Sequence, residues 1–286
     1  MLSLFNHNGV IREFSAGEEI VNEIALHFNL NEAQSSAHLE TVYRKENRIK
    51  RSSLWHRLLF RAADSLANQS LVSRPTTTAK LTGRREWMLT EMGFDSALNL
   101  LNIPIEKKEQ FSIKSFEVEK IAKKIHSASR PVHYDPISQE KKIIKVEKDV
   151  KIRLRGFRQA VIEAYDFKCA VCGLKLCTPD FTSWEVEAAH IVPHGFMGKD
   201  DIWNGLALCR LHHWAFDAGW FTLTHDLKTE VSVRINDLPN HFGTMHGHPV
   251  FQELAANKSP IFLPKNSELH PHVNSINWHR EVIFSK

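Results

Sequence analysis

The chain has 286 residues, of which 42% are hydrophobic and 24% charged, with a formal net charge of +4. These proportions are typical of a globular protein of one large or two ordinary domains, and no apolar run of 18 residues predicts a membrane span. The first residues lack a signal peptide and the four cysteines do not indicate a disulfide framework, so we expect a cytoplasmic protein.

The positive charge is concentrated in residues 41–85. This segment holds eleven Lys and Arg residues against Glu46 and Asp64, a net charge of +9. A concentrated positive segment suits a surface that binds a polyanion such as nucleic acid. The alternative is a well-solvated helix face, which is the more common meaning of a charge run alone.

Three helices are predicted at the start of the chain. Residues 17–25 have helical apolar spacing with Ser15 as a candidate cap, and residues 31–39 form a second, short helix. Residues 48–68 form a third, in which Leu54, Leu58, Ala62 and Leu66 make one apolar stripe.

Two short strands, residues 71–74 and 86–89, follow with a basic, Thr-rich turn between them, and Thr90 caps another helix. Three helices followed by a two-stranded ribbon are the plan of a winged helix. Residues 5–102 resemble the N-terminal winged-helix domain of Mrr-type restriction enzymes, on the stretches SLWHRLLFRAADSL, LVSRP and REWMLTEMG. The third helix is then the groove reader, and the predicted DNA contacts are Lys50, Arg51, Arg57, Arg61, Arg84 and Arg85.

Residues 105–149 are rich in Lys, Glu and Ser, follow Pro104 and contain Pro131 and Pro136, which predicts a linker with one helix in KSFEVEKIAKKIHSA. A further helix, RLRGFRQAVIEAYDF, then leads into a cysteine turn. The sequence therefore predicts a reading domain over residues 1–104, a connector over residues 105–149 and a second domain over residues 150–286.

Two pairs of potential metal ligands mark the second domain. Cys169 and Cys172 have C-x-x-C spacing, and Cys209 and His212 have C-x-x-H spacing. Each pair occupies one tight turn, and two such pairs make a closed tetrahedral site that suits structural zinc. The alternative for Cys172 and Cys209 is a buried core thiol. Cys177 is left over as an ordinary thiol.

Between the pairs, residues 183–192 predict a strand that ends at Pro193, followed by a loop, a short strand at residues 206–208 and a helix from His212 to Gly219. His190, Asn204 and His213 have the order and spacing of the HNH nuclease motif on a ββα-metal fold. Residues 152–284 resemble the HNH domains of predicted restriction endonucleases, on the text AAHIVPHG, WNGLALCRLHHWAFDAGWFTL and IFLPKNSELHPHVNSINWHREVIF.

The resemblance implies a role for each motif residue. His190 is expected to be the general base, because a neutral imidazole can take a proton from water. Asn204 is expected to hold the loop and to orient that imidazole by a hydrogen bond. His213 is expected to bind the catalytic ion, Mg²⁺ or Mn²⁺.

The sequence departs from the family at Ala189, where many relatives have a metal-binding Asp or His. Glu187 lies on the same strand face as Ala189, and Asp217 lies one helical turn after His213. We prefer Asp217 slightly, because two ligands four apart on a helix are a simple arrangement. Either carboxylate is equally well explained as a solvated side chain or a helix cap.

The predicted fold class is α+β: an N-terminal winged helix, a linker and a C-terminal ββα-metal nuclease domain with a structural zinc site. The leading hypothesis is a metal-dependent endonuclease that cuts double-stranded DNA in restriction or defence and works as a homodimer. The resemblance also allows a dependence on methylated or hydroxymethylated bases. One alternative is a DNA-binding regulator with a winged helix, a zinc site and no cleavage activity. Another is an HNH enzyme or toxin that cuts RNA.

Overall fold

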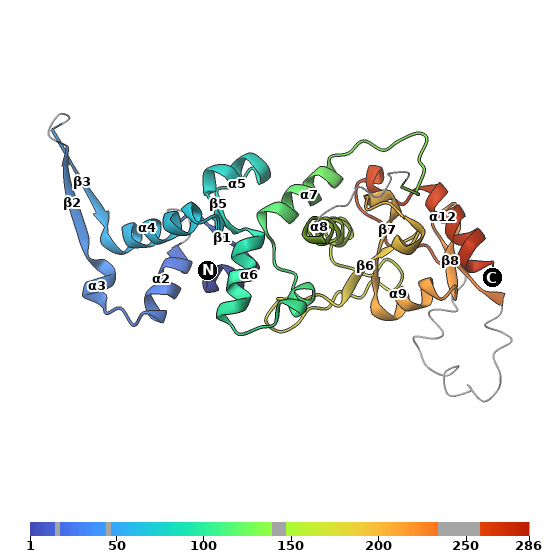
Figure 1. Cartoon of the computed structure of the whole chain (residues 1–286), viewed down its shortest axis with the longest axis horizontal. Coiled ribbons are helices and arrows are strands. Elements are labelled where there is room, and N and C mark those ends of the chain that lie inside the picture. The colour runs from blue at the N-terminus through green and yellow to red at the C-terminus, as the bar shows by residue number, and fades with distance from the viewer. Residues whose placement is uncertain (15–17, 44–46, 139–146, 234–257, 286) are drawn as a thin grey trace. The chain divides into compact units, whose positions relative to one another are not determined.

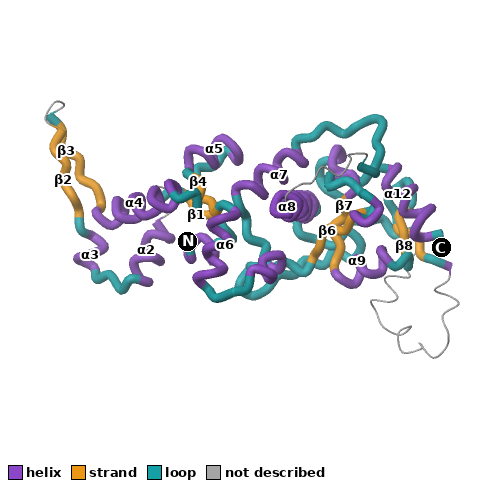
Figure 2. The backbone as a smooth tube through the Cα atoms, in the orientation of Figure 1, coloured by secondary structure: helices purple, strands orange, loops and turns teal. Residues whose placement is uncertain are grey.

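A computed structural model describes residues 1–14, 18–43, 47–138, 147–233 and 258–285. The chain divides into two compact units, Met1–Glu117 and Val118–Lys286, each with its own buried core. Both units combine helices with small antiparallel sheets, in agreement with the α+β prediction (Figures 1 and 2). The boundary between the units lies in α7, within the predicted connector. Among the described helices, none has both the length and the apolarity that a membrane crossing requires.

The first unit is built around a three-stranded sheet of order β1-β5-β4, with helices packed around a core that includes Phe14, Trp87 and Phe94. The helices of the unit are α1 (Leu2–Asn6), α2 (Glu18–His27), α3 (Glu32–Ser36), α4 (Leu54–Asn68), α5 (Pro75–Thr82), α6 (Glu91–Leu100), a 3₁₀ helix (Ile105–Gln110) and the first residues of α7 (Phe116–His126). The strands are β1 (Val10–Arg12), β2 (His38–Tyr43), β3 (Arg48–Ser53), β4 (Val72–Ser73) and β5 (Glu86–Leu89).

Several predicted elements of this unit are confirmed. α2 corresponds to the first predicted helix, although its candidate cap Ser15 lies outside the described residues. α3 begins with a capping box in which Asn31 and Gln34 each accept a hydrogen bond from the other's backbone. Thr90 caps α6 by accepting a hydrogen bond from Gly93 N at 2.9 Å. Strands β4 and β5 pair antiparallel, as expected of the ribbon.

The third predicted helix is wrong in its first turn and a half. Arg48–Ser53 form strand β3, which pairs with β2 over six residue pairs from His38↔Ser53 to Tyr43↔Arg48. The helix begins only at Leu54, because the Ser53 side chain accepts a hydrogen bond from His56 N and caps it there. Figures 1 and 2 show β2 and β3 as a two-stranded ribbon that joins α3 to α4. Lys50 and Arg51 therefore lie on a strand and not on a helix.

The predicted turn between β4 and β5 is also wrong, because it is the helix α5. Pro75 occupies its first turn, and Gly83 ends it in a left-handed conformation with φ of +77°. Proline at the start and glycine just past the end are common signals of a short helix. The structure does not show the winged-helix arrangement that the sequence predicts, since a helix stands where the wing should be.

The second unit contains the predicted order of strand, loop, strand and helix. β6 (Val186–His190) pairs antiparallel with β7 (Gly205–Cys209), in a register that runs from Val186↔Cys209 to His190↔Gly205. α9 (Arg210–Asp217) follows β7 directly, and short 3₁₀ turns at His194–Phe196 and Ile202–Asn204 shape the loop between the strands.

The long helix α8 (Glu147–Ala164) packs against this hairpin through Phe157 and Val161. Gly205 permits a close approach, because a Cβ atom there would lie 2.5 Å from Val161 Cγ2. The hairpin is therefore fixed against α8 by a site where only glycine fits.

The last helices anchor the end of α9 and the hairpin of β8 (Phe221–Leu223) and β9 (Thr229–Val231). His279, at the end of α12 (Val273–His279), stacks on Phe216 of α9 with ring centroids 3.7 Å apart. Its Nε2 donates to Phe216 O at 3.1 Å, and its Nδ1 accepts from Thr222 Oγ1 at 2.9 Å.

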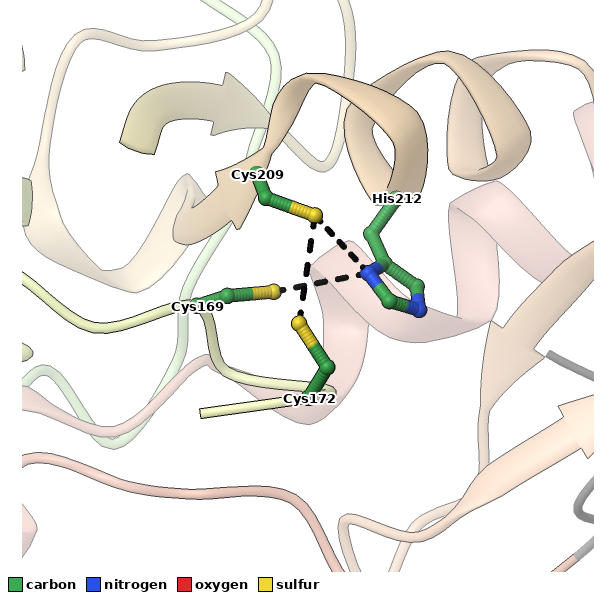
Figure 3. A group of neighbouring side chains, drawn as sticks. All are labelled: Cys169, Cys172, Cys209 and His212. Carbon is green, nitrogen blue, oxygen red and sulfur yellow. Dashed lines mark hydrogen bonds between the residues drawn. The ribbon is translucent and has the colours of Figure 1, made fainter. Parts of the chain in front are cut away.

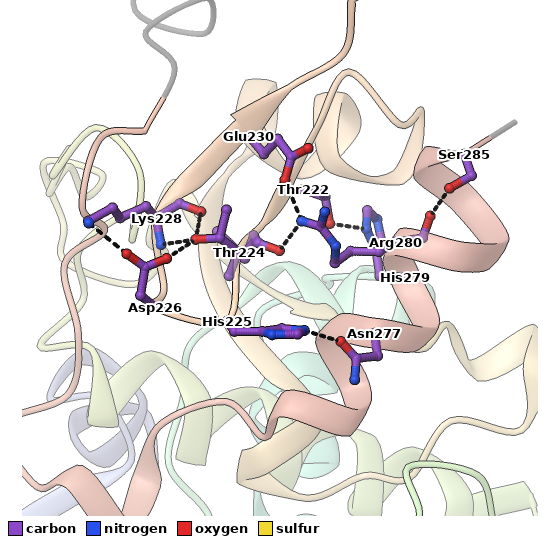
Figure 4. Close-up of polar contacts among 11 residues, drawn as sticks. Thr222, Thr224, His225, Asp226, Lys228, Glu230, Asn277, His279, Arg280 and Ser285 are labelled. Carbon is purple, nitrogen blue, oxygen red and sulfur yellow. Dashed lines mark hydrogen bonds and ion pairs between the residues drawn. The ribbon is translucent and has the colours of Figure 1, made fainter.

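In the π-helix that follows (Arg280–Phe284), Arg280 donates to Leu223 O and to Glu230. Figure 4 shows the contact between Arg280 and Glu230. A 3₁₀ turn at Ser267–Leu269 precedes these elements. The tail therefore supports the helix that carries His213.

Candidate functional site

The four predicted zinc ligands converge on one point, as Figure 3 shows. Their ligand atoms all lie within 4.8 Å of one another. Cys172 Sγ is 3.9 Å from Cys209 Sγ, and Cys169 Sγ is 3.6 Å from His212 Nδ1. With zinc–sulfur bonds of about 2.3 Å, the ligand atoms at the corners of a tetrahedron lie about 3.8 Å apart, close to the two distances given above. The cluster of Cys169, Cys172, Cys209 and His212, called the Cys₃His cluster below, therefore fits a structural zinc ion.

The elements around the Cys₃His cluster explain why the pairs meet. Cys169 and Cys172 lie in the turn after α8, and the turn is closed by Gly173 N donating to Cys169 O at 2.9 Å. Gly173 has φ of +73°, and an added Cβ would lie 2.9 Å from the Phe262 ring. Cys209 ends β7 and His212 lies in the first turn of α9. Cys177 lies apart from the cluster, in an isolated bridge with Trp184.

His190 ends β6 and is held on two sides. Its ring stacks on Phe157 of α8 with centroids 4.1 Å apart and an interplanar angle of 20°. Its Nε2 lies 2.9 Å from Oδ1 of Asp200, a residue of the loop between the strands. The side chain is 15% exposed, so one edge of the imidazole reaches solvent. Asp200 was not among the residues that the motif predicts.

Asn204 is fully buried and hydrogen-bonds to the loop between the strands. Its Oδ1 accepts from Val192 N at 2.8 Å, and its Nδ2 donates to Val192 O and Lys199 O at 3.1 and 3.0 Å. Gly198 allows this packing, since a Cβ there would lie 3.0 Å from Asn204 Nδ2. The hydrogen bond to the imidazole of His190 that the sequence predicts for Asn204 is instead made by Asp200.

His213 of α9 lies between both candidate carboxylates. Glu187 Oε2 is 2.9 Å from Nδ1, and Asp217 Oδ2 is 3.5 Å from Nε2. The hydrogen bond between Glu187 and His213 raises the pKa of the histidine and lowers the pKa of the carboxyl, whereas burial raises the pKa of Asp217. The two nitrogens of the His213 ring point in different directions. A cation bound at Nε2 would therefore have Asp217 as its neighbouring carboxylate, and a cation bound at Nδ1 would have Glu187.

The surroundings of the two carboxylates differ. Arg210 Nε lies 3.3 Å from Glu187 Oε1, so this carboxylate already has a cationic neighbour. Asp217 feels the positive charge of both His213 and His190, which opposes the effect of burial on its pKa. Ala189, between Glu187 and His190, is fully buried in the core and offers no ligand.

The predicted DNA contacts are all exposed side chains of the first unit. Arg57 Nη1 lies 3.4 Å from Thr41 Oγ1, which joins α4 to the β2–β3 ribbon. Arg85 is engaged by Glu13 through two hydrogen bonds of 2.6 and 3.0 Å, and this contact lowers the pKa of Glu13. Arg61 and Arg85 line a hollow of about 500 Å³ together with Phe60, Arg74 and Trp87.

Comparison with known proteins identifies the hairpin and its cysteine turns. The family model of the HNH endonucleases matches residues 169–224, from Cys169 through β6, β7 and α9 to the end of β8. A modification-dependent TagI restriction endonuclease of known structure is similar over 44% of this chain, with 22% identity and a TM-score of 0.31. The match covers 36% of that protein's chain, and no curated protein matches this one. Residues 169–224 therefore form an HNH endonuclease domain.

Proposed function

We propose that the protein is a metal-dependent endonuclease that hydrolyses phosphodiester bonds of double-stranded DNA. The observation that carries this proposal is the placement of His190 and His213 within the HNH endonuclease domain, at the end of β6 and on the helix that follows β7. His190 acts as the general base, because its imidazole, 15% exposed, can accept a proton from an attacking water. Asn204 keeps the loop closed behind it.

His213 and Asp217 are proposed to hold the catalytic divalent ion, with Glu187 as the alternative partner. An imidazole with carboxylate oxygens is a donor set that Mg²⁺ or Mn²⁺ accepts. The ion, when bound, supplies positive charge to the scissile phosphate and its leaving oxygen. The preference for Asp217 over Glu187 is supported by the position of Asp217 3.5 Å from His213 Nε2 and by the Arg210 neighbour of Glu187.

The first unit is proposed to bind the DNA duplex. Its exposed basic side chains lie on α4, on the β2–β3 ribbon and before β5, and phosphate contacts from such residues position a protein on DNA. Helix α4 is followed by the antiparallel strands β4 and β5, and α5 lies between these strands in place of the predicted turn. The proposal includes a role in restriction or defence. It also includes a dependence on methylated or hydroxymethylated bases, which the first unit would recognise.

Cleavage of plasmid DNA tests the proposal. Wild-type protein with Mg²⁺ or Mn²⁺ should convert supercoiled plasmid to nicked or linear forms, on unmodified, methylated or hydroxymethylated DNA. His190→Ala should lose this activity, whereas His133→Ala, an exposed histidine of the same unit, should keep it. If wild-type protein cuts none of these DNAs while it binds them, the regulator without cleavage activity is the better description. A matched RNA digestion distinguishes an RNA-cutting enzyme.

A further inference from the structure

The carboxylate of Asp200 is buried between two partners of opposite kind. Its Oδ1 lies 2.9 Å from His190 Nε2, and its Oδ2 lies 2.6 Å from Arg153 Nε of α8. The Asp200 side chain is only 4% exposed. Burial works to raise the pKa of this carboxyl, but the hydrogen bond from His190 and the charge of Arg153 lower it below its ordinary value. Asp200 is therefore ionised at neutral pH.

An ionised carboxylate only accepts hydrogen bonds, and this decides which nitrogen of His190 carries the proton. Nε2 must be the donor to Asp200, so in the neutral imidazole Nδ1 has the lone pair. A general base needs a lone pair at the atom that faces the water. The tautomer that Asp200 selects is thus one in which Nδ1 is ready to accept a proton.

Helix α8 fixes both the carboxylate and the ring. Arg153 and Phe157 are four residues apart and so project from the same side of the helix. Arg153 pairs with Asp200, and Phe157 stacks on the imidazole. The stacked ring of Phe157 opposes tilting of the imidazole out of its plane. The ion pair with Arg153 opposes displacement of Asp200, which accepts the hydrogen bond from the imidazole. The orientation of His190 is therefore set from outside the strand–loop–strand–helix segment.

We propose that Asp200 is a positioning residue for the nuclease reaction, which holds His190 in the tautomer with a proton on Nε2, and that Arg153 holds Asp200 in place. This inference rests on the proposed role of His190 as general base. The positive charge that forms on His190 when it takes a proton is also stabilised by the carboxylate at 2.9 Å. In this arrangement Asp200 touches neither the water nor the phosphate.

Asp200→Asn is the first variant to measure. The amide has the same shape but can both donate and accept, so it no longer selects one tautomer. We expect kcat for plasmid cleavage to fall at least about a hundredfold, while KM for DNA changes less than about twofold. Asp201→Asn is the matched control: the adjacent Asp201 is half-buried and accepts from Tyr134 OH at 2.5 Å, not from His190. It should retain the wild-type tautomer of His190.

Nitrogen-15 NMR of ring-labelled histidine reads the tautomer directly and needs no activity. The His190 signals are assigned by their loss in His190→Gln. Wild-type protein should show His190 protonated at Nε2, and Asp200→Asn should show the Nδ1 form or a mixture. Arg153→Gln should weaken the preference, and Arg153→Lys should restore it by keeping the positive charge beside Asp200. Equal zinc content and melting temperature would show that each variant is folded.

The possible results separate this inference from the proposed function. A wild-type His190 protonated at Nδ1, or an Asp200→Asn variant with unchanged tautomer and unchanged kcat, would overturn the role of Asp200 and leave the nuclease proposal standing. Failure of wild-type protein to cut any DNA would remove the nuclease proposal and this role with it. A fall in kcat with a changed tautomer, absent in Asp201→Asn, supports it.

Discussion

At the scale of single residues, the two carboxylates beside His213 make a sharp test of the catalytic ion site. Asp217→Asn should lower kcat at least about a hundredfold, because loss of a carboxylate ligand weakens the binding of the ion that stabilises the transition state. Glu187→Gln should cost about tenfold or less, the effect expected of a residue that only orients His213. Both variants are isosteric, and plasmid cleavage across a range of Mn²⁺ concentrations measures them. The reverse ranking would assign the ion to Nδ1 and Glu187.

His279 gives a prediction for stability against pH. Burial lowers its pKa from 6.5 to about 4, so the folded protein keeps this histidine neutral where the unfolded chain protonates it. Between these values the unfolded state binds more protons, and the free energy of unfolding therefore falls as the pH falls from 6.5 towards 4. The contribution lost by pH 5 is about 2 kcal/mol.

Urea denaturation at pH 7 and pH 5 measures this loss. His279→Phe keeps the stack on Phe216 but has no titrating group, so its stability should change less between the two pH values than that of wild type. The comparison of the two proteins removes other groups that titrate in the same range. An equal loss in both would show that His279 is not responsible.

At the scale of elements, the Cys₃His cluster joins the turn after α8 to the start of α9. Cys169→Ser should lose bound zinc and unfold this part of the domain, because a structural zinc site contributes its binding free energy to folding. Zinc analysis and circular dichroism check this expectation. Cys177→Ser is the matched control, since Cys177 lies outside the cluster, and it should keep both zinc and fold. A folded, zinc-free Cys169→Ser protein would contradict the structural role of the site.

The β2–β3 ribbon and α4 carry the predicted phosphate contacts. Replacing both Lys50 and Arg51 by Ala should reduce the slope of log Kd against log salt by about 1.8, if each contacts one phosphate. Binding is measured with the full chain in Ca²⁺, which is expected to slow cleavage. Lys107→Ala removes an exposed charge outside this segment and should leave the slope unchanged. An unchanged slope in the double variant would remove the ribbon from the DNA-binding surface.

The elements around the site show which parts of the fold were predictable. The order helix, turn, strand, loop, strand, helix was predictable from the sequence, because the C-x-x-C and C-x-x-H pairs and the apolar runs of β6 and β7 are local signals. Arg48–Ser53 misled the prediction: its polar residues fit a helix extension, and only pairing with His38–Tyr43 makes it a strand. The role of Asp200 was not predictable, since its partners His190 and Arg153 are 10 and 47 positions away.

At the scale of the whole molecule, a homodimer is the expected form of an enzyme that cuts both strands of a duplex. Two HNH domains in one complex would convert supercoiled plasmid to linear DNA with little nicked intermediate. Sedimentation should then give twice the chain mass of 32.9 kDa at concentrations where linear product dominates. A monomer that nicks first and linearises slowly would contradict this form. The three-part division at residues 104 and 149 stays a prediction beside the two observed units.

The contact between the tail and α9 has a consequence for the order in which the protein becomes active during synthesis. His279 and Arg280 cover Phe216 and the β8–β9 hairpin, next to the helix that carries His213. Proteins are made from the N-terminus and their domains fold as they emerge, so the first unit forms before residues 273–284 exist. If the first unit binds DNA as proposed, a nascent chain on the ribosome would engage nucleic acid before α9 has the support of the tail. A chain whose translation stops before residue 273 would then hold DNA without cutting it.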